Sequence, residues 1–287
     1  MDLDAGPLKY KKTIIFPASL DSDAVKIIRR LCNFGHTSYL VGGCVRDLLL
    51  GKIPKDFDIS TSARPRQIKR IFKNARIIGR RFRLVHVIFR DKIIEVSTFR
   101  KSPDQATDES NSDGLLILRD NTYGDERDDS LRRDFTINGL FYDIKNEEVL
   151  DYTNGVKDIQ RRIIRTIGDP HIRFQEDPVR ILRAIRFSCR LNLEIDPQDF
   201  EAMKEYAEEI QKSASQRVTE EIIRLMACGA SAKALQMMHP LGLIQILLPE
   251  VDKALEHHSP FFDSKDNGWD FLLKLAEGDD DSDRGGY

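Results

Sequence analysis

The stretch that decides the fold reads Leu-Val-Gly-Gly-Cys-Val-Arg-Asp-Leu-Leu-Leu-Gly over residues 40–51 and Lys-Asp-Phe-Asp-Ile over residues 55–59. The pattern predicts a short apolar strand that runs into Gly42 and Gly43 and then into a helix. Glycines at such a junction let backbone N–H groups approach phosphate oxygens, and a helix N-terminus favours negative charge. A tight turn explains the glycine pair as well, so the pair alone does not decide a function.

Two carboxylates stand two residues apart, at Asp56 and Asp58. Residues 56–60 predict a strand, and residues two apart on a strand point to the same face. Carboxylates so placed repel each other unless a cation lies between them, and hard oxygen ligands suit Mg²⁺. Two such ions can clamp the attacking and the leaving oxygen of a phosphoryl transfer. A surface loop would explain an isolated pair, but the glycine pair and Arg46, which can neutralise a triphosphate, stand close by in the sequence.

These motifs together resemble the head of the class II tRNA nucleotidyltransferases and bacterial poly(A) polymerases. Two later motifs agree in order. Leu-Arg-Arg-Asp-Phe-Thr-Ile-Asn at residues 131–138 is similar to the second motif of that family, and Glu-Asp-Pro-Val-Arg-Ile-Leu-Arg-Ala-Ile-Arg-Phe at residues 176–187 is similar to its nucleotide-reading helix. The resemblance covers roughly residues 18–250.

The second motif offers two explanations. Arg132 and Arg133 can pair with phosphates, and the Asp134 carboxylate can accept a hydrogen bond from a ribose hydroxyl, which would favour ribonucleotides. A charged helix start with Asp134 as its N-cap explains the same residues. The resemblance implies nucleotide binding for this motif, Asn138 included.

In the later motif, Asp177, Arg180, Arg183 and Arg186 recur every three residues and form one polar stripe on a predicted helix. An aspartate beside an arginine offers acceptors and a planar donor fork, which can recognise a base edge without a template. The resemblance assigns this task to Asp177 and Arg180, and leaves Arg183 and Arg186 to support them or to contact phosphates. An intrahelical ladder of salt bridges would explain the spacing but not the absence of balancing acids.

Glu95 lies on a strand predicted over residues 92–99, which pairs with a strand over residues 83–89. If this strand neighbours the strand of Asp56 and Asp58, Glu95 can be a third catalytic carboxylate. A cross-strand partner for an arginine is the equal alternative.

The alternation of these patterns predicts an α+β fold. Residues 18–155 form a nucleotidyltransferase head with a small mixed or antiparallel sheet and flanking helices, and residues 156–260 form an all-helical neck and partial body. Residues 1–17 are expected to be irregular, and residues 101–114 to form a mobile loop. Residues 264–287, with seven acids and three bases, are expected to be disordered and to make no RNA contacts.

Composition limits the remaining possibilities. The four cysteines are scattered without a CxxC motif, which argues against a zinc site or a disulfide framework and favours a reducing compartment. We therefore expect a cytoplasmic protein, or an organellar one if a transit peptide has been removed. No apolar run approaches the ~20 residues that span a bilayer, so no membrane partner is expected. Arginine clusters at residues 76–83, 161–165 and 180–190 suit a polyanion such as RNA.

The resemblance implies an enzyme that adds AMP from ATP to the 3′ end of mRNA, other RNA or tRNA, with two Mg²⁺ ions held by Asp56 and Asp58. Residues 77–87 and 118–124 look closer to the poly(A) polymerases. A CCA-adding enzyme, which would use CTP as well, is the alternative within the family. A non-catalytic RNA-binding regulator that kept the fold is the alternative of another class. The acidic ending predicts either a truncated chain or one that relies on a partner to hold RNA.

Overall fold

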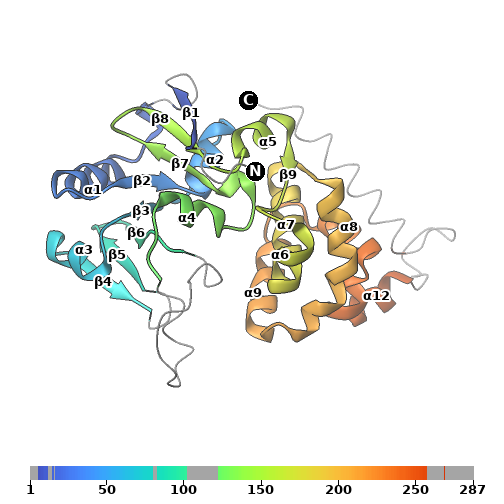
Figure 1. Ribbon diagram of the computed structural model, residues 1–287. Coiled ribbons are helices and arrows are strands. Elements are labelled where there is room, and N and C mark those ends of the chain that lie inside the picture. The colour runs from blue at the N-terminus through green and yellow to red at the C-terminus, as the bar shows by residue number, and fades with distance from the viewer. Residues whose placement is uncertain are drawn as a thin grey trace, which may run out of the picture. The chain divides into compact units, whose positions relative to one another are not determined.

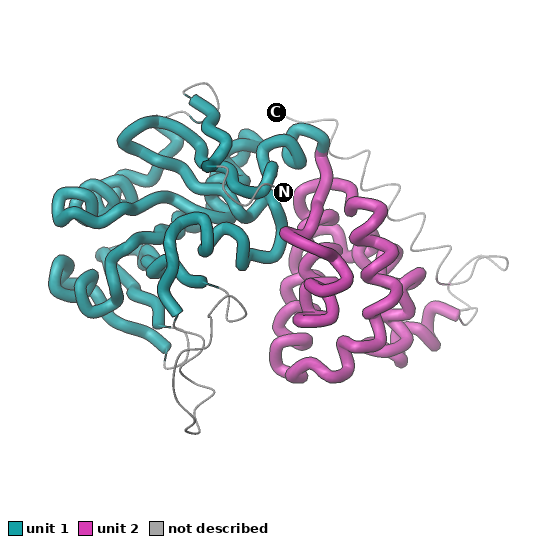
Figure 2. The backbone as a smooth tube through the Cα atoms, viewed as in Figure 1, with its two compact units in different colours: residues 1–161 teal, residues 162–287 magenta. Residues whose placement is uncertain are grey.

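The computed structural model describes residues 6–11, 15, 17–79, 83–101, 122–256 and 268. The chain divides into two compact units, residues 1–161 and residues 162–287 (Figure 2). Helix α5 (Gly155–Arg161) belongs to the first unit, because the Thr136 hydroxyl donates to the Asp158 carboxylate at 2.7 Å. The expected mobile loop and acidic tail lie outside the described residues, apart from residues 101 and 268.

Unit 1 is built on one eight-stranded sheet in the order β1-β8-β7-β2-β3-β6-β5-β4 (Figure 1). The strands are β1 (Leu8–Lys11), β2 (Ser38–Val41), β3 (Ile59–Thr61), β4 (Ala75–Ile78), β5 (Leu84–Ile88), β6 (Ile93–Thr98), β7 (Leu140–Asp143) and β8 (Glu148–Asp151). Neighbouring strands are antiparallel except β3 and β6, which are parallel. The predicted mixed sheet is therefore confirmed.

Four α-helices and a 3-10 turn flank this sheet: α1 (Ser22–Asn33), α2 (Gly43–Leu49), α3 (Pro65–Ile71), α4 (Glu126–Leu131) and η4 (Thr136–Asn138). Helix α1 begins after Asp21, whose carboxylate accepts hydrogen bonds from the backbone of Asp23 and Ala24, as an N-cap should. Buried and more open residues alternate along β5 and β6, as predicted. Val85 and Val96 are fully buried, and their neighbours on each strand are more open. The apolar face of the sheet thus forms the core on which the helices pack.

Three strand predictions need correction. The strand expected over residues 56–60 begins only at Ile59, because Gly42 turns the partner strand away: its N–H donates to Leu140 and its φ is 68°. Strand β1 lies in the stretch expected to be irregular. Its side chains are mostly exposed at the sheet edge, so it carries no apolar alternation. Strand β4, four residues long on the opposite edge, was also not predicted.

Unit 2 is mostly helical, as predicted. Its helices are α6 (Pro170–Glu176), α7 (Val179–Leu191), α8 (Pro197–Tyr206), α9 (Ser215–Met226), α10 (Ser231–Met238), α11 (Leu243–Leu247) and α12 (Pro249–Glu256), with 3-10 turns η5 (Ala207–Lys212) and η6 (His239–Leu241). Two short strands, β9 (Ile163–Ile164) and β10 (Glu194–Ile195), pair in parallel, which corrects the expectation that no strand follows residue 158.

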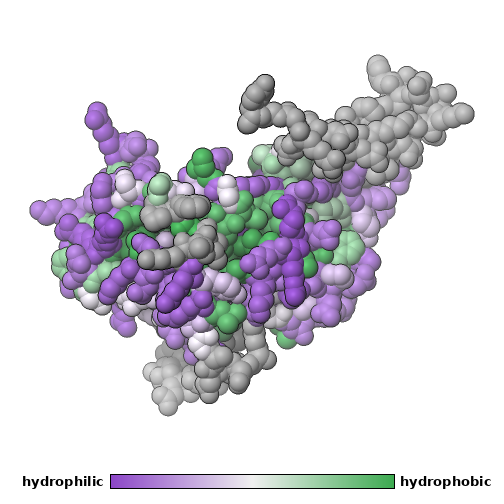
Figure 3. All heavy atoms as spheres, turned by 90° about the horizontal axis from the view of Figure 1, so that it is seen from above, coloured by the Kyte–Doolittle hydropathy of each residue, from purple (hydrophilic) through white to green (hydrophobic). Residues whose placement is uncertain are grey.

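Apolar side chains account for the packing of unit 2. Helix α7 is its most buried element, with Ile181, Leu182 and Ile185 inaccessible to solvent. On the face of the molecule that Figure 3 shows, hydrophilic side chains project outward and hydrophobic ones lie largely between them. None of the described helices is long and apolar enough to cross a membrane.

Candidate active site

The carboxylates of Asp56 and Asp58 lie in the irregular segment that leads into β3, and both residues are exposed. The segment is tied to β2 at its end, where the Val41 N–H donates to the Asp58 carbonyl at 3.1 Å. The two residues therefore stand at the entrance of a central strand. The prediction that both side chains point to one face assumed a strand at residues 56–58, and the structure has no strand there.

Asp58 carries the clearest electrostatic signature of the site. Burial by surrounding protein atoms, followed by the negative charges of Glu95 and Asp56, raises the pKa of Asp58 to about 6. The positive charge of Arg133 acts to lower the pKa. The charges of two carboxylates and one arginine thus act on Asp58, and the raised pKa means that an added positive charge is favoured there.

Glu95 lies on β6, directly beside β3, so the predicted neighbourhood of the two strands is confirmed. Across the next strand pair Glu95 stands opposite His86, and its carboxylate is 3.6 Å from the His86 Nε2 atom. The cross-strand partner is therefore a histidine, not the arginine that was the alternative.

The donor set suits a hard divalent cation. Within the described residues, no group of three histidine, cysteine, aspartate or glutamate side chains is arranged to hold a metal ion. Mg²⁺ is commonly held by only one or two carboxylates together with substrate phosphates. Asp56 and Asp58, with the nearby charge of Glu95, therefore fit a Mg²⁺ site that substrate completes.

Gly42 provides space for an arginine. It is the N-cap of α2, with φ 68° and ψ −126°, a conformation that only glycine adopts readily. A Cβ atom on Gly42 would lie 2.8 Å from the Arg133 Nη1 atom, whereas one on Gly43 would be 3.6 Å from the Arg46 side chain. The absence of a side chain at Gly42 thus lets the Arg133 guanidinium pass beside the start of α2.

Arg46 is buried, with 3% of its surface exposed. Its guanidinium donates to the Asp47 carboxylate at 2.7 and 2.8 Å and to the Asn138 Oδ1 atom at 2.7 Å. Asn138 in turn donates to Asp134, which also accepts the Phe135 N–H at 2.8 Å. This arrangement favours a positioning role for Arg46 and Asn138. Asp134 is not the helix N-cap that was the alternative, because the N-cap of η4 is Phe135. A ligand contact for these residues stays a prediction.

A residue that the sequence analysis missed organises the second motif. Asp129 is fully buried and accepts hydrogen bonds from Arg132 at 2.8 Å and from Arg133 at 3.0 Å. Burial alone would raise the pKa of Asp129, but the two guanidinium groups lower it below its usual range. The acid stands just before the recognised motif, at Asp128-Asp129, and looked like an ordinary acidic helix start.

In unit 2, Asp177 ends helix α6. Its Oδ2 atom accepts a hydrogen bond from Arg217 of α9 at 2.7 Å, a partner that the sequence analysis also missed. Its Oδ1 atom is buried and accepts no hydrogen bond from the residues that the structure describes. One oxygen of Asp177 is thus held in place, and the other has no hydrogen-bond donor among the described residues.

The arginine stripe on α7 finds acids on neighbouring elements. Arg180 donates to Glu176 at 3.1 Å and to the Arg173 carbonyl, and Arg186 is buried against Glu221 of α9. Arg183 lies over the Phe187 ring at 5.7 Å. The balancing acids, absent from the stripe itself, therefore come from α6 and α9.

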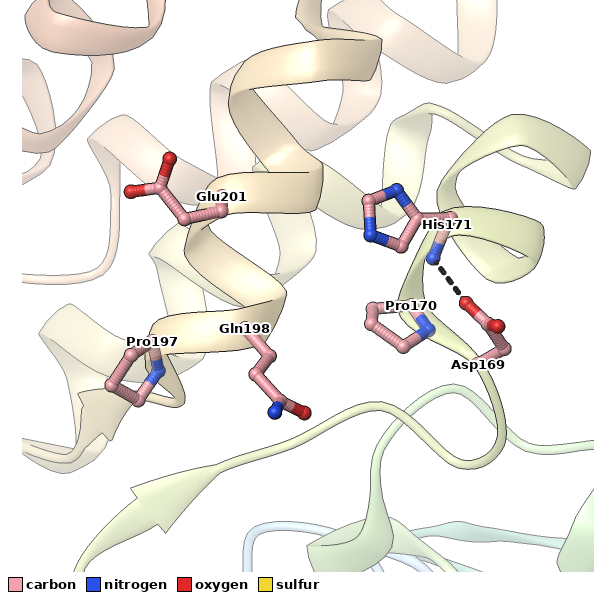
Figure 4. Close-up of a pocket in the computed structure, with 6 residues that line it drawn as sticks. All are labelled: Asp169, Pro170, His171, Pro197, Gln198 and Glu201. Carbon is pink, nitrogen blue, oxygen red and sulfur yellow. Dashed lines mark hydrogen bonds between the residues drawn. The ribbon is translucent and has the colours of Figure 1, made fainter.

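A separate hollow of about 570 Å³ lies between the starts of α6 and α8. It is lined by Asp169, Pro170, His171, Pro197, Gln198 and Glu201 (Figure 4). The His171 N–H donates to Asp169 at 2.9 Å within its wall. It contains none of the predicted site residues, and its two carboxylates make it a poor host for phosphate.

Comparison with known proteins decides the family. Residues 38–165 match the model of the poly A polymerase head domain, and residues 192–255 match the model described as the probable RNA and SrmB-binding site of polymerase A. Poly(A) polymerase I of Salmonella typhi is 43% identical over 239 residues, which cover 82% of this chain and 51% of that protein. The chain belongs to the family of bacterial poly(A) polymerases and CCA-adding enzymes.

Other members of the family are similar over the same region. Poly(A) polymerase I of Haemophilus influenzae is 40% identical over 86% of the chain and 55% of that protein. The CCA-adding enzyme of Staphylococcus aureus strain MRSA252 is 38% identical over 72% of the chain and 50% of that protein. The chain thus spans about half the length of the curated relatives it matches.

The fold agrees with solved structures of the family. The Bacillus stearothermophilus CCA-adding enzyme in complex with CTP is 33% identical and superposes with a TM-score of 0.67, covering 77% of this chain and 52% of that one. The Thermotoga maritima CCA-adding enzyme complexed with tRNA, 23% identical, has a TM-score of 0.65 over 84% of this chain and 55% of that one. The predicted α+β nucleotidyltransferase fold is confirmed.

Proposed function

We propose that this chain carries the catalytic part of a template-independent RNA 3′-end nucleotidyltransferase that adds AMP from ATP, as a poly(A) polymerase does. The observation that supports this most is the placement of Asp56 and Asp58 at the entrance of β3, next to the strand that carries Glu95, in a chain that is 43% identical to poly(A) polymerase I over 82% of its own length. In the reaction, the RNA 3′ oxygen forms a bond to the α-phosphorus of ATP, the bond to pyrophosphate breaks, and the hydroxyl proton is lost.

The proposed roles in unit 1 follow from position and charge. Asp56 and Asp58 would hold Mg²⁺, with Glu95 as a third carboxylate. When bound, the ion supplies a positive charge that orients the phosphates and stabilises the oxygens that gain charge. Arg133 would bind phosphate beside Gly42, since its guanidinium already lies at the start of α2 and acts on Asp58. Arg132, paired with Asp129, would support it.

The proposed base reader lies in unit 2. Asp177 would accept from the base with its available Oδ1 atom, while Arg217 fixes the other oxygen. Arg180 would donate to the base after exchanging its contact with Glu176, which lies at the surface. Arg183 and Arg186 would support α7, because one packs on Phe187 and the other is paired with Glu221.

A CCA-adding activity is the second candidate, and the 38% identity to a CCA-adding enzyme favours it specifically. RNA 3′ ends are the proposed partners in both cases, and ATP or CTP the proposed substrates. A reducing, cytoplasmic location stays a prediction from the cysteine pattern.

The test is incubation of the chain with Mg²⁺, labelled ATP or CTP, and two RNAs: a tRNA that lacks its 3′ end and a generic oligoribonucleotide. We expect ATP incorporation into both RNAs. Incorporation of CTP and ATP into the tRNA alone would establish the CCA-adding alternative. RNA binding without any incorporation would contradict both and favour the non-catalytic regulator.

Nucleotide choice supplies a further prediction. Asp177→Ala and Arg180→Ala are expected to reduce the preference for ATP over UTP and to weaken ATP binding, because each removes one side of the proposed base contact. Arg190→Ala, a nearby exposed position on α7, is the matched control. Unchanged ATP-over-UTP ratios in the two site variants would refute the role of the pair.

A further inference from the structure

Residues 61–90 carry an extreme charge bias. This stretch holds ten basic residues and no acid, although the whole chain has a net charge of −2. The ten are Arg64, Arg66, Lys69, Arg70, Lys73, Arg76, Arg80, Arg81, Arg83 and Arg90. The stretch covers α3, both strands at one edge of the sheet, and their connections.

Four of these residues form one continuous surface, which we call the α3 basic face: Arg66, Lys69, Arg70 and Lys73. Their spacing of three, four and seven residues places them on one side of the helix and its end. All four are exposed, and none forms an ion pair with any residue that the structure describes. The apolar residues Ile68 and Ile71 point inward and are buried.

Helix α1 extends this surface. Arg29 and Arg30 are exposed near its C-terminal end. The Arg30 guanidinium lies over the ring of Phe72, the residue that caps α3, at 5.5 Å from its centroid. The acids of α1, Asp21 and Asp23, are already paired with Lys92 and Lys26. The positive charge is therefore not neutralised across the helix pair.

Structural explanations do not account for the α3 basic face. The helix dipole favours Lys69 and Arg70 in the last turn of α3, but it does not favour Arg66 in the first turn, and like charges three and four residues apart destabilise a helix. Protection of a sheet edge against aggregation explains Arg76, which is exposed on edge strand β4. It does not explain a helix that packs on the sheet face. A solvated surface helix would normally carry both signs of charge.

We infer that the α3 basic face binds the phosphate backbone of an RNA strand, upstream of the 3′ end that reacts. This inference rests on the proposed function for the identity of the polyanion. The surface is distinct from the carboxylate site, because α3 follows the C-terminal end of β3 whereas Asp56 and Asp58 precede its N-terminal end. A membrane surface fits less well, since α3 exposes no apolar side chain that could enter lipid.

The test compares two triple variants with equal loss of charge. Arg66→Ala/Lys69→Ala/Arg70→Ala removes three contacts of the α3 basic face. Lys11→Ala/Lys145→Ala/Lys157→Ala is the control, because these three exposed lysines of unit 1 lie outside α3 and outside residues 192–255, which match the probable RNA-binding site. Fluorescence anisotropy of a labelled single-stranded oligoribonucleotide, without nucleotide, gives the affinity between about 50 and about 200 mM salt.

The slope of log affinity against log salt changes by about 0.7 for each phosphate contact to a single strand, so we expect a slope smaller by about 2 in the α3 variant. The control should keep the wild-type slope. The α3 variant should unfold at the same or a slightly higher temperature, since it loses repulsion and gains alanine in a helix. An unchanged slope in the α3 variant, or an equal loss in the control, overturns the inference.

Two further outcomes separate this inference from the proposed function. Incorporation of ATP by the wild-type chain with an unchanged salt slope in the α3 variant would overturn the surface alone. A smaller salt slope in the α3 variant, together with no nucleotide incorporation by the wild-type chain, would support RNA binding by the α3 basic face and contradict the proposed function. Loss of binding to anionic lipid vesicles with RNA binding intact would assign the α3 basic face to membranes and also overturn the inference.

Discussion

At the scale of single residues, the site depends on two features that are easily overlooked in the sequence. Gly42 lacks the Cβ atom that would meet Arg133, and buried Asp129 holds Arg132 and Arg133 together. Asp129 is not proposed to touch substrate, and Gly42 would do so only through its backbone. Both determine where the Arg133 side chain can lie, so substitution at either position tests the proposed geometry without removing a side-chain ligand.

Gly42→Ala should separate backbone strain from the clash with Arg133. The positive φ strains alanine at this position whatever space surrounds it. Gly51→Ala is the matched control, because Gly51 has φ 70° but no atom within 4 Å of an added Cβ. We expect both variants to lose unfolding free energy in urea, with loss of ATP incorporation only in Gly42→Ala. Equal activity in the two variants would show that ATP incorporation does not depend on the space that Gly42 leaves for the Arg133 side chain.

Asp129→Asn should destabilise the head strongly. It removes the buried negative charge that pairs with both Arg132 and Arg133, and loss of one partner of a buried ion pair costs about 3–5 kcal/mol. Exposed Asp91, in the turn between β5 and β6, serves as the control. Urea unfolding of Asp129→Asn and Asp91→Asn measures the difference. A loss below about 1 kcal/mol at position 129 would mean that the arginines find other partners.

At the scale of elements, most of the fold follows from periodicity. Helix α1 and the β5–β6 hairpin were predicted because apolar residues recur with a clear period and turn residues separate them. Strand β3 was predicted too long, since sequence cannot show that Gly42 bends its partner away. Of the candidate site, the motifs located the carboxylates and arginines. The ion pairs of Arg217 with Asp177 and of Glu221 with Arg186 join distant elements and leave no periodic signal. The ion pairs of Asp129 are local, but this acid stands just before the recognised motif.

The start of α8 carries a pH-sensitive contact. Asp199 is buried and accepts the Thr166 N–H at 2.6 Å, and burial raises the pKa of Asp199 to about 6. Between about pH 4 and about pH 6 the folded protein therefore holds a proton that the unfolded chain has lost, so this contribution to stability falls as the pH rises. By neutral pH this contribution to the free energy of unfolding is lower by about 3 kcal/mol than at about pH 4.

Asp199→Asn should remove this dependence, because asparagine keeps an acceptor for Thr166 and does not titrate. The measurement is the difference in unfolding free energy between Asp199→Asn and wild type, at about pH 4 and about pH 7. We expect the unfolding free energy of the variant to rise relative to that of the wild type as the pH rises. A difference that stays constant over this range would show that Asp199 is ionised throughout.

At the scale of the whole molecule, the proposed activity divides between two units. Under this proposal, unit 1 would supply the carboxylates and the phosphate-binding arginines, and unit 2 would supply the Asp177 acceptor and the arginine stripe. The chain spans about half the length of its curated relatives, so an activity assay also tests whether these two units suffice for catalysis.

The most direct test of the central claim is Mg²⁺-dependent incorporation of labelled ATP into an RNA 3′ end by the wild-type chain, Asp58→Ala and Asp91→Ala. Asp91 is an exposed carboxylate in the turn between β5 and β6, so its variant controls for loss of charge. Unfolding curves of all three proteins verify that they are folded. We predict that Asp58→Ala falls to the background seen without Mg²⁺, while Asp91→Ala matches wild type. Incorporation near the wild-type rate by folded Asp58→Ala would contradict the proposed site.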